Sequence, residues 1–327
     1  MNLQTEFKKR EEVFSEYWLK YLQDGKPASL YDAARHLPMG GGKRLRPFLV
    51  MLSCEIVSGN AEKTLPFGAA LELMHNFTLV HDDIMDKSNL RRNVPTVHIK
   101  FGAPAAILAG DLLFARSFEA MHDLSVGCSV FKQLDRLLIQ CILNICEGQQ
   151  LDVEFEQRKI IPEEEYTDMI TRKTAVLFRL AAKGGAIIGE GSEDEISALA
   201  EYGLYLGLSF QIWDDYLDMS SDEETLGKDI GNDIRNGKKT LIAVYSLQNA
   251  TDENKKILDD VFGNCNASDN DIKRVFTLFK EMGSIDYAKK TAIEYTKKAK
   301  NALAILKDSE AKELLYDLAD YSINREN

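Results

Sequence analysis

Apolar residues recur at three-to-four-residue spacing through most of the 327-residue chain. The pattern is clear over residues 272–282 and 287–306, where it predicts amphipathic helices rich in Ala, Leu, Ile, Lys and Glu. Residues 67–80 and 199–212 are apolar nearly all round, which predicts helices at the centre of a large bundle. No sustained apolar–polar alternation lies between tight-turn dipeptides, so no strands are predicted.

Glycine and proline interrupt this helical pattern at a few places. The breaks lie at residues 38–42 (PMGGG), 59–60 (GN), 94–96 (VPT) and 102–104 (GAP). All seven prolines lie at or before Pro162, and no low-complexity linker or change of composition divides the chain. We therefore predict a single all-α domain over residues 1–327, built as one large helical bundle.

Composition narrows the possible functions and locations. With 40 Lys and Arg against 52 Asp and Glu, the net charge is −12, which argues against a nucleic-acid-binding protein. Residues 1–14 lack the apolar stretch of a signal peptide, and no run of about 18 apolar residues could span a membrane. Five cysteines without zinc-site spacing are expected to be buried free thiols in a reducing, cytoplasmic location: Cys54, Cys128, Cys141, Cys146 and Cys265.

Two copies of the motif DDxxD, here called the aspartate boxes, lie at residues 82–86 and 214–218, and each ends a predicted apolar helix. Asp82 and Asp86 are four residues apart, so on a helix their carboxylates project from one face and repel each other. One such box can be plain solvated surface, but two indicate bound cations. Carboxylate oxygens suit Mg²⁺ held together with substrate phosphates. Facing helices of a bundle could bring both boxes to one site.

Basic residues gather near both boxes and indicate anionic substrates. The segment 40–47 (GGGKRLRP) joins a flexible backbone to three cations, and Lys87, Arg91 and Arg92 follow the first box directly. Arginine offers a fork of donors to a phosphate and lysine a point charge. Further cations lie in the second half of the chain: Lys173, Lys228, Lys238 and Lys239. Each alone could be solvated surface; together with two metal boxes they suggest two phosphorylated substrates.

Several motifs in order resemble those of the trans-isoprenyl diphosphate synthases, the polyprenyl synthetase family. They are GGKRLRP (41–47), HNFTLVHDDIMD (75–86) with Arg91-Arg92, GQQLD (148–152), RKTA (172–175), FQIWDDYLD (210–218) and GKDIGNDIRNGKKT (227–240). The resemblance implies an isoprenoid synthase type I fold with a central cavity, and a cytoplasmic homodimer. It also implies an enzyme that condenses isopentenyl diphosphate with an allylic diphosphate by Mg²⁺-assisted ionisation, condensation and proton loss.

The resemblance also implies a role for each matching residue. Three Mg²⁺ would be bound by Asp82, Asp86 and Asp214, supported by Asp83, Asp215 and Asp218. The allylic diphosphate would lie on Arg91, Lys173, Lys228 and Lys238, and the diphosphate of isopentenyl diphosphate on Lys43, Arg46, His75 and Arg92. Thr174 and Gln211 would stabilise positive charge at the reacting centre, while Gln149 and Asp152 would orient Lys173 or a metal-bound water. His81 lies about 100° off the stripe of His75 and Asp82, and is expected to pack locally.

The residues before the first box bear on product length. The box has no insertion, and Phe77 is an aromatic five residues before Asp82, as in archaeal geranylgeranyl diphosphate synthases, which implies a twenty-carbon product. On a helix, however, Phe77 lies roughly 140° from Asp82, while Thr78 and Met74 lie more nearly beneath it. Phe77 could also be plain core. Whether Phe77 or Met74 ends the cavity stays open.

Three alternatives compete with a geranylgeranyl diphosphate synthase. A farnesyl synthase, or an enzyme giving both products, differs only in product length. A class I terpene cyclase usually replaces the second box by an Asn/Ser/Glu motif and needs no GGKRLRP segment. A non-catalytic prenyl synthase subunit typically lacks one box, whereas both boxes are whole here.

Overall fold

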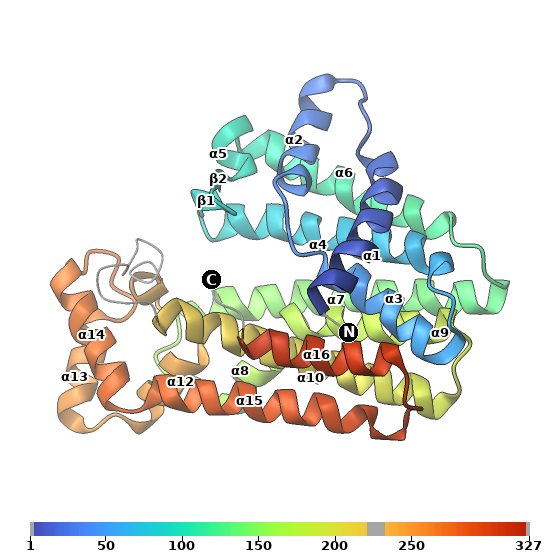
Figure 1. Cartoon of the computed structure of the whole chain (residues 1–327). Helices are drawn as coiled ribbons and strands as arrows, with labels where there is room; N and C mark the ends of the chain where they lie inside the picture. The colour runs from blue at the N-terminus through green and yellow to red at the C-terminus, as the bar shows by residue number, and fades with distance from the viewer. Residues whose placement is uncertain (1–2, 221–232, 325–327) are drawn as a thin grey trace. The chain divides into compact units, whose positions relative to one another are not determined.

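The structure is a computed structural model that describes residues 3–220 and 233–324, and these residues are helical almost throughout (Figure 1). The first half contains α1 (Leu3–Trp18), α2 (Ala28–Met39), α3 (Leu45–Ser58), α4 (Leu65–Met85), α5 (Val97–Phe101), α6 (Ala103–His122) and α7 (Cys128–Glu156). The second half contains α8 (Glu163–Ile170), α9 (Val176–Ile188), α10 (Glu193–Ser220), α12 (Leu241–Asn249), α13 (Asp252–Val261), α14 (Asp269–Glu281), α15 (Ser284–Ala302) and α16 (Glu310–Asn324). Short 3₁₀ turns cover Leu19–Leu22, Glu62–Thr64 and Leu303–Ile305, and a π-helix, η3, covers Thr171–Ala175.

The all-α prediction is confirmed, and the predicted breaks fall between helices or at their ends, where Pro38 and Met39 form the last residues of α2. Gly59 follows α3 in a left-handed conformation, which glycine adopts without steric cost, and the 102–104 break separates α5 from α6. The helices predicted over 272–282 and 287–306 correspond to α14 and α15. The apolar stretches 67–80 and 199–212 lie within α4 and α10, where most of their residues are buried.

The prediction of no strands was wrong at one place. A small antiparallel hairpin pairs β1 (Leu90–Arg91) with β2 (Val94–Pro95). Its two turn residues, Arg92 and Asn93, have φ of 53° and 63°, which is the left-handed turn that matches the twist of a hairpin. Strands of two residues are too short to show alternation in the sequence. The hairpin carries both arginines that follow the first aspartate box.

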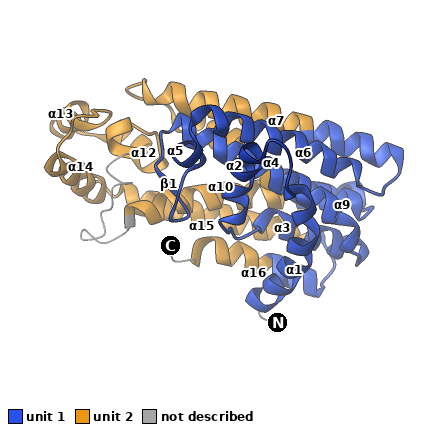
Figure 2. Cartoon of the chain, turned by 90° about the horizontal axis from the view of Figure 1, so that it is seen from above, with its two compact units in different colours: residues 1–138, 180–200, 305–315 blue, residues 139–179, 201–304, 316–327 orange. Residues whose placement is uncertain are grey.

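Packing divides the chain into two compact units (Figure 2). Unit 1 comprises residues 1–138, 180–200 and 305–315. Its buried interior includes the N-terminal part of α4, packed against α3 and α6. The part of α9 in this unit includes Gly185, where an added Cβ would lie 2.9 Å from the Cβ of Ser53 on α3, so glycine permits close helix packing.

Unit 2 comprises residues 139–179, 201–304 and 316–327. One hydrophobic cluster joins the end of α7 with α8, η3, α10, α12, α13, α14 and α15, and its largest fully buried side chains include Phe155, Tyr166 and Phe279. Burial of this much aromatic surface is a main source of stability for such a unit. The prediction that residues 1–327 form a single domain stays a prediction.

The cysteine prediction needs one correction. All five thiols are free, as expected, but only Cys54 and Cys141 are buried. Cys146 follows the buried Ile145 on α7, and one residue corresponds to about 100° of rotation, so its side chain turns outward. Cys128 starts the same helix and Cys265 lies between α13 and α14, both exposed.

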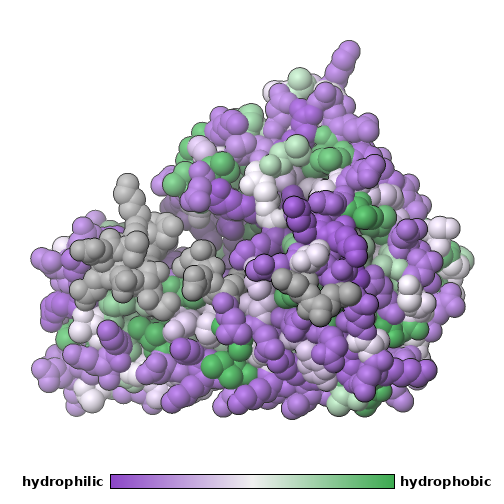
Figure 3. Space-filling model, in the orientation of Figure 1, coloured by the Kyte–Doolittle hydropathy of each residue, from purple (hydrophilic) through white to green (hydrophobic). Residues whose placement is uncertain are grey.

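None of the helices in residues 3–220 and 233–324 is long and apolar enough to cross a membrane. The face of the molecule drawn in Figure 3 is mostly hydrophilic, with small separate apolar patches.

Candidate active site

The first aspartate box lies at the C-terminal end of α4. The helix ends at Met85, and the backbone N–H of Asp86 donates to the carbonyl of Asp82 at 2.8 Å. Asp82 and Asp86 are therefore one helical turn apart, as the sequence predicted. Asp83, the second of the three aspartates in this box, is buried and only 1% exposed.

Arg91 on the hairpin neutralises this box in part. Its Nε donates to Asp83 Oδ1 at 2.7 Å, and a second nitrogen lies 3.8 Å from Asp82 Oδ2. Burial raises the pKa of Asp83, and Arg91 opposes that rise. Asp83 Oδ2 is buried with no hydrogen-bond partner among the described residues. The hairpin thus places a forked cation against the carboxylates that end α4.

The glycine-rich segment that precedes α3 is held by arginines. Arg92 donates to the carbonyls of Gly41 and Leu37. Arg44 is buried and donates to Glu72 Oε1 at 2.5 Å and to the carbonyl of Pro38 at 2.6 Å. Sequence reasoning counted Arg44 with Lys43 and Arg46 as cations for a phosphate and gave Glu72 no role, because a buried ion pair between Arg44 and Glu72 leaves no local pattern.

His75 lies on α4 among these arginines. Burial and the nearby charges of Arg46, Arg92, Arg91 and Arg44 hold the pKa of His75 well below its usual range. A neutral imidazole at neutral pH therefore stands in a strongly positive region. Four arginines that all act on one histidine mark a place where an anion would be favoured. Lys43, the remaining predicted cation of this set, is exposed.

The predicted product-length residues lie in the same helix with different surroundings. The ring of Phe77 lies 5.0 Å from that of Phe114 on α6 and is half-buried. Met74 is fully buried, and Thr78 donates its hydroxyl to the carbonyl of His75 at 2.8 Å. Both Phe77 and Met74 stay candidates for the residue that ends the cavity.

His81 packs locally, as expected from its position off the Asp82 stripe. Its Nε2 lies 3.1 Å from the carbonyl oxygen of Ile107, and its ring occupies the space beside Gly110 on α6. Its ring also contacts Phe77 edge-on, with centroids 4.9 Å apart. His81 therefore belongs to the contact between α4 and α6.

In unit 2 the RKTA motif forms the π-helix η3, between α8 and α9. Lys173 donates to Asp152 Oδ2 at 2.5 Å, and Thr174 donates to Gln211 Oε1 at 2.9 Å. A glycine allows η3 to pack closely against α10, because a Cβ added at Gly207 on α10 would lie 2.6 Å from the Cα of Ala175. π-helical turns occur frequently at functional sites. The family resemblance associated Asp152 with Lys173 or a metal-bound water and Thr174 with Gln211, but the sequence analysis predicted neither the hydrogen bond between Thr174 and Gln211 nor the π-helix.

The second aspartate box lies near the end of α10. Gln211 donates to Asp215 Oδ1 at 3.0 Å, and Tyr166 of α8 donates to Asp215 Oδ2 at 3.1 Å. Burial raises the pKa of Asp215 to about 8, although the hydrogen bond from Gln211 and the charge of Lys238 act in the other direction. Tyr166 was missed by the sequence analysis because no motif contains it. Asp214 is half-buried and Asp218 exposed.

The lysines of unit 2 differ in their environments. Although burial alone would raise it, the pKa of Asp152 is lowered, because Lys173 and Lys238 both act on it. Lys239 is 3% exposed and donates to the carbonyl of Gly237 at 2.7 Å. Lys228 lies outside the described residues.

The predicted site residues therefore fall into one set in each unit. Unit 1 holds Lys43, Arg46, Met74, His75, Phe77, Thr78, Asp82, Asp83, Asp86, Arg91 and Arg92. Unit 2 holds Lys173, Thr174, Gln211, Asp214, Asp215, Asp218 and Lys238. Among residues 3–220 and 233–324, no three His, Cys, Asp or Glu side chains form a metal-binding group. The hard carboxylate oxygens of each box nevertheless fit Mg²⁺, which commonly takes one or two carboxylates together with substrate phosphates.

One protein-family model matches most of this chain, and several relatives and solved structures match nearly all of it. Residues 27–279 match the family model described as polyprenyl synthetase. The geranylgeranyl diphosphate synthase of Methanosarcina mazei is 43% identical, covering 100% of this chain and 99% of the relative. The crystal structure of geranylgeranyl pyrophosphate synthetase from Pyrococcus horikoshii has a TM-score of 0.94 and 42% identity, covering 99% and 98% of the two chains. A geranylfarnesyl diphosphate synthase of Natronomonas pharaonis is 36% identical, covering 99% and 98%.

These matches confirm the resemblance that the motifs indicated. The family model covers most of the chain, and the neighbouring structure confirms the predicted fold class as well. The chain belongs to the polyprenyl synthetase family.

Proposed function

We propose that the protein is a geranylgeranyl diphosphate synthase, a trans-prenyltransferase that adds isopentenyl diphosphate head-to-tail to allylic diphosphates up to twenty carbons. The combination of two features supports this function. The likeness to geranylgeranyl diphosphate synthases extends along the whole chain, and both aspartate boxes are intact at the ends of α4 and α10. A non-catalytic subunit or a cyclase does not account for that combination.

The carboxylates are proposed to hold Mg²⁺ against the allylic diphosphate. Enzymes of this family depend on Mg²⁺. We assign three ions to Asp82, Asp86 and Asp214, with Asp83, Asp215 and Asp218 in support. When bound, Mg²⁺ neutralises the leaving diphosphate. The cations assigned to the same diphosphate are Arg91, Lys173, Lys228 and Lys238. Arg91 already lies against Asp82 and Asp83, so its guanidinium is held at the box before any substrate arrives.

The positive region around His75 is proposed to bind the diphosphate of isopentenyl diphosphate. Arg46 and Arg92 both act on the imidazole, and the glycine segment beside them also contains the exposed Lys43. An incoming anion would offset the repulsion among these cations, which gives the site its affinity. It would also raise the pKa of His75, because it stabilises the protonated imidazole.

The reacting carbons are proposed to lie beside Thr174 and Gln211. The hydrogen bond between the two leaves both side chains oriented, and their oxygen atoms can stabilise the positive charge that develops as the allylic C–O bond breaks. The alkene of isopentenyl diphosphate then attacks that carbon, with proximity as the main source of acceleration. A proton leaves the product, and the departed diphosphate accepts it.

The assembly and location of the enzyme are further parts of the proposal. We propose a homodimer located in the cytoplasm. All five cysteines are free thiols, which supports a reducing compartment.

Product analysis tests this function. The protein is incubated with isopentenyl diphosphate, Mg²⁺ and either dimethylallyl, geranyl or farnesyl diphosphate, and the products are sized after removal of the diphosphate. We expect a twenty-carbon product from all three primers. No turnover with any primer would overturn the synthase assignment. A fifteen-carbon or twenty-five-carbon main product would keep the synthase but replace geranylgeranyl by farnesyl or geranylfarnesyl diphosphate.

A further inference from the structure

Arg44 lies within the glycine-rich segment but is enclosed by protein. It is 8% exposed, and its guanidinium stacks over the Trp18 ring at 4.3 Å from the ring centre. Its two terminal nitrogens donate to Glu72 at 2.5 Å and to the carbonyl of Pro38 at 2.6 Å. Glu72 is 2% exposed and also accepts a hydrogen bond from Asn76. These contacts within unit 1 enclose the guanidinium, so it does not serve as a substrate ligand.

The backbone of Arg44 is as constrained as its side chain. Its φ of 41° lies in the left-handed region, which a residue with a Cβ rarely adopts, and it immediately precedes α3. Strained residues of this kind persist only where surrounding contacts hold them, and they cluster at functional sites. The ion pair with Glu72 supplies such a contact.

Two arginines donate to backbone carbonyls in and beside this segment. Arg44 binds Pro38, and Arg92 of the hairpin binds Leu37 and Gly41. Gly42 has a φ of 133°, and a Cβ there would lie 2.8 Å from the Arg92 guanidinium. The position of Arg92 therefore depends on the path of the segment that Arg44 anchors.

We propose that Arg44 is a positioning residue for isopentenyl diphosphate. Its buried ion pair with Glu72 fixes the path of residues 38–44, so that Lys43, Arg46 and Arg92 converge near His75 before the substrate binds. The inference rests on the proposed function for the identity of the ligand. A phosphate site gains from such preorganisation, because no loop has to be ordered upon binding.

Steady-state kinetics and calorimetry on the full-length protein test this role, well below the unfolding temperature of every variant. In Arg44→Lys the ammonium cannot contact Glu72 and Pro38 together or stack on Trp18. We expect the KM and Kd for isopentenyl diphosphate to rise about 10- to 100-fold, the range for a small misplacement of binding groups. The KM for farnesyl diphosphate should rise less than that for isopentenyl diphosphate, because among its proposed ligands only Arg91 lies beside a group that this segment positions.

The double variant Arg44→Met, Glu72→Met separates positioning from stability. Apolar residues of similar volume often replace a buried ion pair without loss of stability. The double variant should therefore unfold near the wild-type temperature while its Kd for isopentenyl diphosphate stays raised. Recovery of both the unfolding temperature and the Kd would overturn the inference, and so would an unchanged Kd in Arg44→Lys.

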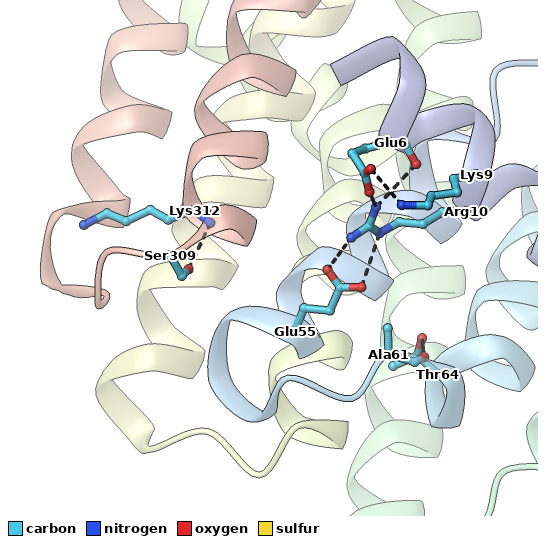
Figure 4. Close-up of polar contacts among 8 residues, drawn as sticks. All are labelled: Glu6, Lys9, Arg10, Glu55, Ala61, Thr64, Ser309 and Lys312. Carbon is cyan, nitrogen blue, oxygen red and sulfur yellow. Dashed lines mark hydrogen bonds and ion pairs between the residues drawn. The ribbon is translucent and has the colours of Figure 1, made fainter. Parts of the chain in front are cut away.

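Arg10 offers a matched control in the same unit (Figure 4). It joins α1 to α3 by donating to Glu55 at 2.8 Å and 3.2 Å, and it also pairs with Glu6. Arg10→Met should lower the unfolding temperature but leave the Kd for isopentenyl diphosphate unchanged. A Kd raised as much as in Arg44→Lys would mean that any loosening of unit 1 has this effect, and would overturn the inference. Absence of wild-type turnover overturns the proposed function instead, and the Kd values then decide on Arg44.

Discussion

Both aspartate boxes carry the motif DDxxD, but the side chains that compensate their carboxylates differ. In unit 1 the middle carboxylate, Asp83, accepts from the guanidinium of Arg91. In unit 2 the middle carboxylate, Asp215, accepts from the neutral donors Tyr166 and Gln211. Burial raises the pKa of both carboxyl groups, and that of Asp215 reaches about 8. A motif therefore specifies where carboxylates stand on a helix, while the helices packed around it decide how each one is compensated.

The difference extends to the cations of each unit. Unit 1 concentrates arginines around His75, and unit 2 sets Lys173 and Lys238 around Asp152. Arginine forks fix the geometry of planar groups, whereas lysine acts as a movable point charge. We therefore expect the arginines of unit 1 to be held in place before an anion binds, and the lysines of unit 2 to move more readily.

The largest expected effect comes from the first residue of each box, which should be equally necessary despite these different surroundings. Asp82→Ala and Asp214→Ala should each lower kcat by at least about 10³-fold, because a metal-bound diphosphate loses a ligand at the moment its charge develops. Initial rates with saturating Mg²⁺ and both substrates measure this. Addition of excess chelator to the wild type should give a comparable loss.

Asp194→Ala is the control for this pair, because Asp194 is an exposed aspartate in the first turn of α10. It should keep the wild-type rate. If either box variant keeps more than about a tenth of the wild-type kcat, the box concerned does not hold an essential Mg²⁺.

Removing the partner of each middle aspartate tests the comparison directly. Arg91→Met leaves the buried Asp83 without its cation and should lower the free energy of unfolding by about 3 kcal/mol. Tyr166→Phe removes one neutral hydrogen bond from Asp215 and should cost about 1 kcal/mol. Denaturant unfolding without Mg²⁺ or substrates measures both values. Asp83→Asn combined with Arg91→Met should recover part of the first loss, and equal losses for the two single variants would contradict the comparison.

Much of the site could be predicted because it follows from local periodicity. The helices that end in Asp82–Asp86 and Asp214–Asp218 were evident from apolar runs followed by carboxylates at one-turn spacing. The family resemblance implied that Asp152 orients Lys173 or a metal-bound water, and the structure shows its contact with Lys173. It assigned Thr174 and Gln211 to one place, but their hydrogen bond was not predicted. Roles assigned through the family resemblance still need the experiments described above.

What could not be predicted depends on packing between segments far apart in sequence. In the sequence Arg44 follows Lys43, and Lys239 follows Lys238. Arg44 and Lys239 are buried, whereas Lys43 is exposed. The burial of one member of a dibasic pair depends on distant partners such as Glu72, which no local pattern reveals. The exposed Cys146 was missed for a related reason, because an apolar neighbour does not determine the direction of a side chain.

The buried cations of the two units, Arg44 and Lys239, should affect the pH dependence of stability differently. Arg44 has a carboxylate partner, whereas Lys239 has the carbonyl of Gly237 and the ring of Phe262 at 4.9 Å. Burial lowers the pKa of Lys239 to about 8. A lysine whose pKa is lower in the folded than in the unfolded protein binds fewer protons when folded, so stability should rise with pH from about 8 toward 10. Relative to Lys239→Met, the wild type should gain about 2 kcal/mol between pH 7.5 and 9.5.

Unfolding free energies of both proteins across this range give that difference curve, in which the titration of all other groups cancels. The wild type should show no such rise relative to the double variant Arg44→Met, Glu72→Met, because arginine keeps its charge throughout. A flat difference curve for Lys239→Met would show that the buried ammonium is compensated as well as the guanidinium of Arg44.

The smallest effect on rate should come from the residues before the first box, which lie in unit 1. Phe77 is half-buried against Phe114, whereas Met74 is fully enclosed. Phe77→Ala removes a ring that lies to the side of Asp82, so the growing chain gains room and should end at least one five-carbon unit longer, with kcat changed less than about tenfold. Product sizing with farnesyl diphosphate as primer measures this. If Phe77→Ala keeps the wild-type product while Met74→Ala lengthens it, the chain ends at Met74 and Phe77 serves only the contact between α4 and α6.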